Sequence, residues 1–234
     1  MKRALLLAAA FLAIATPATA QQIVAQSNFV NRNQLAQLPQ VSITVRADFV
    51  LFSIRYETAT RSADTRQDEL AKTFAGVVQR AARAEGMSIE VGTPGQSAAI
   101  ETAAIKEMIQ QNGDDRSVIN IVLKVIVRDK ETFEQIRARA EKFVADAPTT
   151  GRVEAVIGDN QFLGIQEPKK HRDTLVKAIA DDVRMMQSSF GGPSGPVSVN
   201  LTGMEARTLT RPVGPLDLEI YIPYSMSVRS GSGN

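Results

Sequence analysis

The sequence predicts an α+β fold, in which long, mostly antiparallel β-strands carry three main helices packed on one face. Several stretches alternate apolar and polar residues with period two, as half-buried strands do. Three other stretches repeat their apolar residues with the period of an amphipathic helix. The two kinds of stretch follow one another as strand, helix, strands, helix, strand, helix and strands. A sheet with helices on one face buries elements in this order well.

The first 20 residues predict a secretory signal peptide that is not part of this fold. Lys2 and Arg3 precede a run of twelve apolar residues, and the small residues at 18–20 match the signal-peptidase cleavage rule. The apolar run is short for a membrane span. We therefore expect cleavage after Ala20 and a periplasmic location. The alternative is that the segment is retained as an N-terminal anchor.

Composition excludes several classes of function. The chain has 27 basic and 25 acidic residues, so removal of Lys2 and Arg3 leaves 25 of each. No basic excess then remains to predict binding of nucleic acid. The absence of cysteine excludes disulfides, thiol catalysis, cysteine metal sites and a lipid anchor on cysteine. Beyond the signal peptide, no segment is apolar enough to predict a transmembrane helix.

The N-terminal part of the mature chain predicts a lead-in followed by strands. Residues 21–40 are rich in Gln and Asn and predict a flexible lead-in. Residues 41–46 and 49–57 alternate apolar and polar side chains, which predicts two short strands or one long, bent strand. We expect one folded domain over 41–229, with 230–234 as a disordered tail.

A first helix is predicted over residues 62–85, followed by a strand over 87–91. Asp64 and Gln67 have the spacing of a capping box. Gly86 suits the left-handed residue found after many helices. The apolar stripe of this helix consists of Leu70, Phe74, Val77, Val78 and Ala81.

Residues 96–111 allow two interpretations. Their Ala, Glu, Lys, Gln and Met content favours a helix. Asn112-Gly113 is instead a strong hairpin signal, which favours a strand paired with residues 118–127. That second segment is apolar at nearly every position, as in a strand covered on both faces.

Two more helices and a kinked strand are predicted next. One helix begins near Asp129 as its N-cap and ends at Pro148. Residues 151–165 predict a strand with a kink near Gly158-Asp159. The third helix spans 168–189. The stripe of the second helix is Phe133, Ile136, Ala140, Phe143 and Val144, and that of the third is Leu175, Ile179, Val183 and Met186, with Val176 beside it.

The C-terminal region predicts two further strands. Val197, Val199 and Leu201 share one face of the first. Residues 216–228 alternate without a break, which predicts one long strand with an apolar and a polar face. Pro223 cannot donate a ladder hydrogen bond, so this strand is predicted at an edge or at a bulge.

The search for chemistry predicts no catalytic, cofactor-binding or metal-binding residue and no cofactor. His171 is the only histidine, and it lies in the first turn of the third helix among Lys169, Lys170 and Arg172. A nucleophile–histidine site needs a third group that orients the ring. No neighbouring residue supplies one, so we interpret His171 as solvated.

The carboxylate pairs and glycine-rich segments also predict no site. Adjacent acids on a helix point away from each other, and residues 112–115 lack the spacing of a calcium loop. The segments 92–95 and 191–196 lack the phosphate-loop spacing. Asn200-Leu201-Thr202 matches a glycosylation sequon, but in a protein with a bacterial-type signal peptide this match does not predict glycosylation. The acid pairs are Asp68-Glu69, Asp114-Asp115 and Asp181-Asp182.

Three stretches resemble the SIMPL-domain family of exported bacterial envelope proteins. Residues 41–58 resemble its opening strand pair around an acidic break, here Ala47-Asp48. Residues 118–136 resemble its long strand followed by an Arg-Asp helix start, and residues 164–187 resemble its late helix. The likeness covers 41–229. Departures are Met185-Met186, where alanine and lysine are usual, and a missing tyrosine-containing stretch between 92 and 117.

The resemblance implies a fold of two BON-like α/β units, a periplasmic location and no enzymatic activity or cofactor. Because some relatives assemble into large rings, it also implies a homo-oligomer with peripheral envelope association. A ligand- or membrane-surface-binding module is the second hypothesis. A hydrolase with an unrecognised site is the third, since a fold alone does not determine function.

Overall fold

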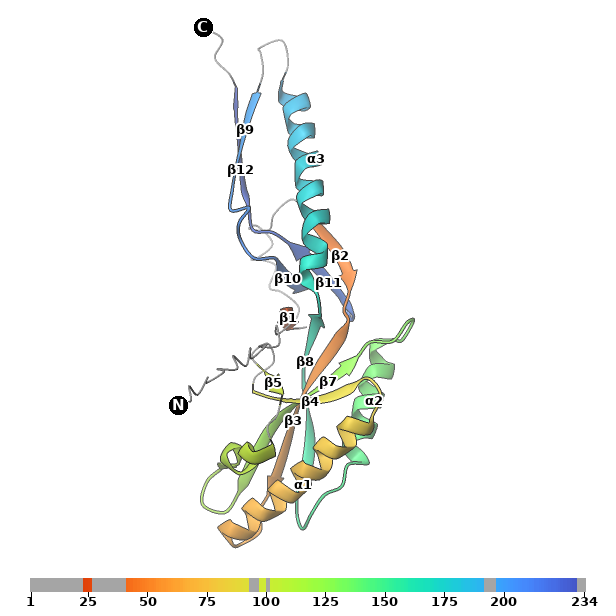
Figure 1. Ribbon diagram of the computed structural model, residues 1–234, viewed down its shortest axis with the longest axis vertical. Helices are drawn as coiled ribbons and strands as arrows, with labels where there is room; N and C mark the ends of the chain where they lie inside the picture. The colour runs from red at the N-terminus through yellow and green to blue at the C-terminus, as the bar shows by residue number, and fades with distance from the viewer. Residues whose placement is uncertain (1–22, 27–40, 93–96, 100–101, 192–196, 231–234) are drawn as a thin grey trace, which may run out of the picture.

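The computed structural model describes residues 23–26, 41–92, 97–99, 102–191 and 197–230. Within these residues the molecule is elongated and has three parts, which we call the body, the neck and the arm (Figure 1). The predicted signal peptide with its cleavage point after Ala20 lies outside the described residues, as does the tail beyond Ser230.

The body is an antiparallel seven-stranded sheet. Its strands run in the order β1-β8-β3-β7-β4-β5, and β6 also pairs with β7. The long strands β3 and β7 lie at the centre of this sheet. The bounds are β1 Ile23–Gln26, β3 Phe49–Thr58, β4 Met87–Val91, β5 Ala98–Ala99, β6 Gln110–Gln111, β7 Ser117–Ile126 and β8 Glu154–Ile165.

Two helices, α1 (Ala63–Arg83) and α2 (Phe133–Ala145), pack on one face of this sheet. The alternate β3 residues Phe52 and Ile54 share one apolar core with Phe74 of α1. The predicted stripes of both helices are confirmed, since each places most of its members in this core. Burial of these side chains is the main source of stability in the body.

The neck is a three-stranded antiparallel sheet in the order β10-β11-β2, formed by β2 (Ser42–Arg46), β10 (Leu209–Pro212) and β11 (Asp217–Tyr221). Its strand β2 leads directly into β3. At the break, the Ala47 N–H donates to Leu216 O (2.8 Å) and the Asp48 N–H donates to Gly164 O (2.9 Å). The prediction of two strands is therefore correct, and each belongs to a different sheet.

The arm consists of α3 (Arg172–Phe190), preceded by the short 3₁₀ helix η3 (Pro168–His171), and of a two-stranded sheet. That sheet pairs β9 (Val197–Thr202) antiparallel with β12 (Ser225–Ser230). α3 and the two strands extend side by side away from the body (Figure 1), and α3 packs against β9. Three α-helices and antiparallel pairing throughout the described residues confirm the α+β class.

Several local predictions need correction. Within the predicted lead-in, residues 23–26 form strand β1, which pairs with β8. The N-cap of α1 is Ser62, whose hydroxyl accepts the Thr65 N–H, and not Asp64. The N-cap of α2 is Thr132, in a reciprocal capping box with Gln135, and not Asp129. A four-residue strand leaves little pattern in a sequence, and each helix offers more than one polar residue suited to an N-cap.

The region 96–111 follows neither interpretation completely. A 3₁₀ helix, η2 (Thr102–Met108), lies between the two-residue strands β5 and β6. The hairpin signal at Asn112-Gly113 is correct, because Gln111 pairs with Ser117 and Gly113 has a φ of 74°. The kink near Gly158 is also confirmed, as the register of β8 on β3 shifts at that point.

The single strand predicted over 216–228 is wrong. Pro223 interrupts it, and the Tyr224 N–H donates to Ile222 O (2.9 Å) in a tight turn. The chain thereby passes from β11 in the neck to β12 in the arm. The alternation continues across the turn because Leu218 and Ile220 of β11 are buried in the core and Met226 of β12 pairs with Leu201 of β9, so the pattern hides the change of sheet. The predicted tail also begins later than residue 230, which belongs to β12.

Candidate functional site

His171 ends η3 and lies in a cleft at the junction of body and neck. The cleft has a volume of about 520 Å³. Its lining residues include acids, bases and apolar groups but no serine, threonine or cysteine that might act as a nucleophile. The lining consists of Arg46, Ala47, Asp48, Ile126, Val127, Arg128, Asp129, Gln166, Glu167, Lys170 and His171.

Two carboxylates of the cleft, those of Asp48 and Glu167, already have partners. Asp48 Oδ2 accepts the Gln166 N–H at 2.8 Å, and the Asp48 carbonyl accepts the Val127 N–H at 2.9 Å. These bonds join β2, β7 and β8 where the body meets the neck. Lys170 pairs with Glu167 across 2.6 Å. The arrangement is that of a strand junction and not of a triad, in which nucleophile, base and orienting acid form a chain.

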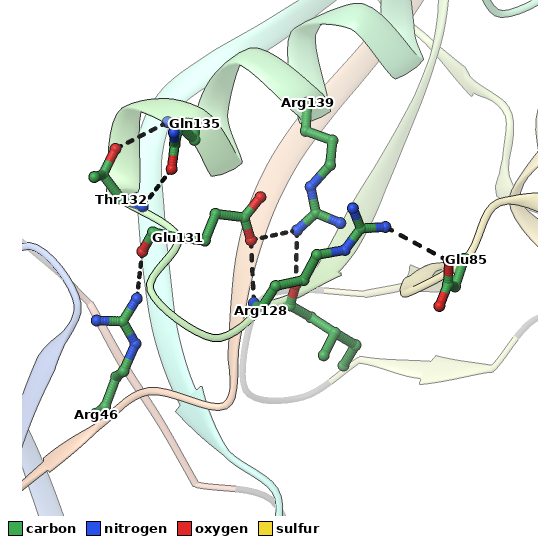
Figure 2. A network of polar contacts seen from close by, with 8 residues as sticks. Arg46, Glu85, Arg128, Glu131, Thr132, Gln135 and Arg139 are labelled. Atoms are coloured by element: carbon green, nitrogen blue, oxygen red, sulfur yellow. Dashed lines mark hydrogen bonds and ion pairs between the residues drawn. The ribbon is translucent and has the colours of Figure 1, made fainter.

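A second polar cluster lies between β7 and α2 and is centred on Glu131 (Figure 2). Glu131 Oε2 accepts from Arg139 Nη2 at 2.9 Å and from the Arg128 N–H at 3.1 Å. The same Arg139 nitrogen donates to Ile126 O at 2.7 Å. Both charged side chains of this pair are largely buried. Such pairing is required for buried charges, and here it closes the loop between β7 and α2.

The cluster also connects the body to the neck. Arg46, at the end of β2, donates to the Glu131 carbonyl (Figure 2). The loop itself contains Lys130, which has a φ of 57° and is the one described non-glycine residue with positive φ. Backbone strain of this kind persists where the surroundings over-determine it. The Glu131 carboxylate and carbonyl therefore hold the loop between β7 and α2 in place.

The predicted carboxylate pairs separate into unrelated contacts. Burial raises the pKa of the Glu69 carboxyl, but hydrogen bonds from Thr58 and Thr60 outweigh this and lower the pKa. Its neighbour Asp68 pairs with Lys106 (3.4 Å). Asp181 pairs with Arg184 (2.9 Å). Among the described residues, no three His, Asp or Glu side chains are close enough to hold a metal ion.

The most buried charge is a residue that the sequence analysis missed. Arg66 in α1 is 2% exposed. Its guanidinium donates to the carbonyls of Thr60 (2.8 Å), Arg61 (3.2 Å) and Asp114 (3.3 Å), and to Ser117 Oγ (3.1 Å). The signal was its spacing, since it lies four residues before Leu70 and so continues the apolar stripe. Arg66 ties two loops to α1 and serves the fold.

The large exposed apolar side chains gather in the arm and neck. Phe190, at the end of α3, is 62% exposed, and Met185 is 55% exposed. In the body, Val156 is the one described large apolar side chain that is exposed. Only a contiguous patch of such side chains marks an interaction surface, and on α3 Val176 and Met185 are nine residues apart, so they lie on opposite sides of the helix. The full set is Val156, Val176, Met185, Phe190, Leu209, Val213 and Val228.

The cover of the arm is incomplete along its length. Of the predicted α3 stripe, Leu175 and Ile179 are buried, whereas Val183 and Met186 are half-buried. In the two-stranded sheet, Leu201 pairs with Met226 and Val199 with Val228, so both strands place their apolar residues on one face. α3 covers the β9 side of this face. The tip of the arm and the β12 side are therefore its least covered parts.

The remaining predicted features add no site. Most of each glycine-rich segment, residues 93–96 and 192–196, lies outside the described residues. Asn200 of the sequon lies in β9 on the face opposite the apolar one. In the part of the chain that the structure describes, no helix combines the length and hydropathy of a membrane span.

Comparison with protein-family models, with curated proteins and with solved structures finds no match for this chain.

Proposed function

We propose that the chain is a non-enzymatic, exported envelope protein of SIMPL type that self-associates into an oligomeric scaffold in the periplasm. The observation that carries the proposal is the arm, in which exposed apolar side chains lie on an element that projects from the body. The polar clusters at the junction support a non-enzymatic role, because the carboxylates of Asp48 and Glu131 are engaged in hydrogen bonds or ion pairs.

The energetics of the arm favour a partner. An isolated two-stranded sheet is marginally stable in water, and α3 covers it only in part. Burying Phe190 alone against a second surface contributes about 1.5–3 kcal/mol. Because the mature chain has equal numbers of acidic and basic residues, net charge does not oppose association of like copies.

Mass photometry or sedimentation velocity of residues 21–234 at micromolar concentration tests the proposal. We expect a species larger than the monomer. Phe190→Ser and Met185→Ser should shift the distribution toward monomer. Val156→Ser, which removes an equally exposed side chain from the body, is the matched control and should change nothing. A monomer at every concentration tested would overturn the proposal.

A membrane-surface module is the second candidate, and the exposed Phe190 favours it. Apolar side chains at the end of an amphipathic helix bind bilayer interfaces. The zero net charge of the mature chain argues against attraction to anionic lipids. Co-sedimentation with vesicles of neutral and of anionic lipid separates the two candidates: vesicle binding that Phe190→Ser abolishes, by a protein that stays monomeric, supports this second function.

A further inference from the structure

Strand β12 is an unprotected sheet edge. It pairs only with β9, in a register that runs without interruption from Ser225↔Thr202 to Ser230↔Val197. Alternate backbone N–H and C=O groups on its other side therefore have no strand partner among the described residues. Unpaired groups of this kind form a template for another strand.

The other described edges are shorter, covered or interrupted; residues 154–161 of β8, which pair only with β3, are interrupted by the irregularity near Gly158. β5 and β6 have two residues each and β1 has four. β10 ends in Pro212, β2 runs at its end into the body, and β9 lies against α3. Natural sheets protect their edges by short length, proline, bulges or a covering helix. β12 has six residues and shows none of these devices; its one protective feature is the charged side chain of Arg229.

The side chains of β12 leave its apolar face open at the same edge. Met226 and Val228 continue the face formed by Val199 and Leu201. Val228 is 40% exposed, whereas its partner Val199 is half-buried because α3 packs over β9. A strand added beside β12 would cover Val228 and extend the apolar face.

We propose that β12 pairs antiparallel with β12 of a second copy, about a two-fold axis at Ser227. The result is a continuous four-stranded sheet in the order β9-β12-β12-β9, with both α3 helices on one face. The inference rests on the proposed self-association and assigns one contact of it, separate from the one that Phe190 and Met185 of α3 would make. An isologous contact of this kind closes at a dimer, so a larger scaffold needs a second contact.

The register is set by which residues face each other. With Ser227 opposite itself, Met226 lies opposite Val228 of the second copy, and Ser225 lies opposite Arg229. A shift by one residue would place the apolar sides of the two copies on opposite faces. An axis at Arg229 would place two like charges directly opposite each other, which destabilises a sheet.

The ends of the strand and its charge agree with this register. Pro223 and the tight turn at Tyr224 end β12 on one side, so pairing is confined to the six strand residues. Arg229 is the single charged residue of β12. In the proposed register it faces a serine, and no like charges oppose each other.

Single cysteine variants of the cysteine-free mature chain test the pairing. In Ser227→Cys the two thiols lie directly opposite across the axis, within the reach of a disulfide. We expect a covalent dimer on mild oxidation. Ser198→Cys is the matched control, because Ser198 is exposed on the same polar face but lies on β9, and it should not cross-link.

Charge variants test the register without a disulfide. Ser225→Glu places a carboxylate opposite Arg229 of the second copy twice, and should tighten the dimer by about 2- to 30-fold at low salt. Ser225→Arg should weaken it by a similar factor.

Three outcomes are decisive. Cross-linking at residue 227 but not at 198, with opposite effects of the two charge variants, supports the inference. Oligomers that neither cross-link at 227 nor respond to charge at 225 overturn the β12 pairing about Ser227 and leave self-association through another register or another surface. A monomer that cross-links at neither position overturns both proposals.

Discussion

The body and the arm are built from the same sequence patterns, yet they bury them to different extents. In α1 the stripe residues Leu70, Phe74 and Val77 are fully buried. In α3 burial is complete at Leu175 and Ile179 and declines toward Phe190. An apolar stripe therefore indicates which face of a helix packs against other residues. It does not indicate whether all of those residues belong to the same chain.

The strands repeat this contrast. β3 has a neighbour on each side over its whole length, whereas β12 has one. In the body, the central strands are paired on both sides and the core side chains are fully buried. The arm leaves an edge and part of a face open, as a surface that meets a partner does.

The largest expected difference between the two regions is the cost of removing a phenylalanine ring. Phe52 is fully buried in the body, with its ring centroid 6.4 Å from that of Phe133. Phe52→Ala should lower the free energy of unfolding by about 3–5 kcal/mol, and Phe190→Ala in the arm by less than about 0.5 kcal/mol. Urea unfolding of the monomer measures both, and equal losses would erase the contrast.

Two arginines sharpen the comparison next. Arg66→Met in the body leaves three carbonyls and a hydroxyl without their donor, which should cost about 2–4 kcal/mol. Arg172, at the start of α3, donates to the carbonyls of Ala206 (2.9 Å) and Met204. Because this site is only partly buried, Arg172→Met should cost about 1 kcal/mol. A larger loss for Arg172→Met in urea unfolding would contradict the ranking.

The sequence predicts the secondary structure of the body more accurately than that of the neck and the arm. The stripes of α1 and α2 and the strand at 118–127 were predicted correctly, because in the body periodicity and burial coincide. The burial of Arg66 was not predicted, because a charged residue is normally expected at the surface. Its burial is possible because the fold brings four neutral acceptors to its guanidinium.

In the arm and neck, the predictions fail where tertiary contacts decide. Alternation over 216–228 could not reveal the passage between two sheets at Pro223, because the period is preserved across the turn. β10 was not predicted, since its four residues alternate too briefly. The cleft at His171 required the meeting of β2, β7 and β8, which no local pattern encodes.

Tyrosines provide a smaller test. Burial raises the pKa of Tyr56 in the body to about 12, and its hydroxyl has no hydrogen-bond partner. The unfolded chain ionises near pH 10, so this contribution to stability is present below pH 10 and is lost as the pH rises toward 12. Tyr56→Phe should remove that alkaline loss and raise stability at pH 7 by about 1 kcal/mol.

At the base of the arm, burial raises the pKa of Tyr224, and the Asp182 carboxylate raises it further. Absorbance titration should show Tyr56 ionising last, together with unfolding. If Tyr56 instead ionised near pH 10 in the folded protein, the body would be more open to solvent than its packing indicates.

The smallest expected effect concerns the decrease in the free energy of unfolding at acidic pH. A hydrogen bond from Arg116 (2.7 Å) lowers the pKa of Glu57, and although burial opposes this, a hydrogen bond from Arg55 also lowers it. The stabilisation is present above the ordinary glutamate pKa of about 4.3 and is lost as the pH falls through the lower folded-state pKa. Glu57→Gln should therefore flatten the decline of stability below about pH 4.3.

In the neck, burial opposes a lowered pKa of Glu219, but hydrogen bonds from Arg211 and Ser42 outweigh it, so Glu219→Gln should act in the same direction. Urea unfolding between about pH 2.5 and 7 measures both. The double variant should show the sum of the two effects, since the carboxylates lie in separate sheets and share no hydrogen-bond partner. A non-additive result would mean that the two carboxylates interact energetically across the junction of body and neck.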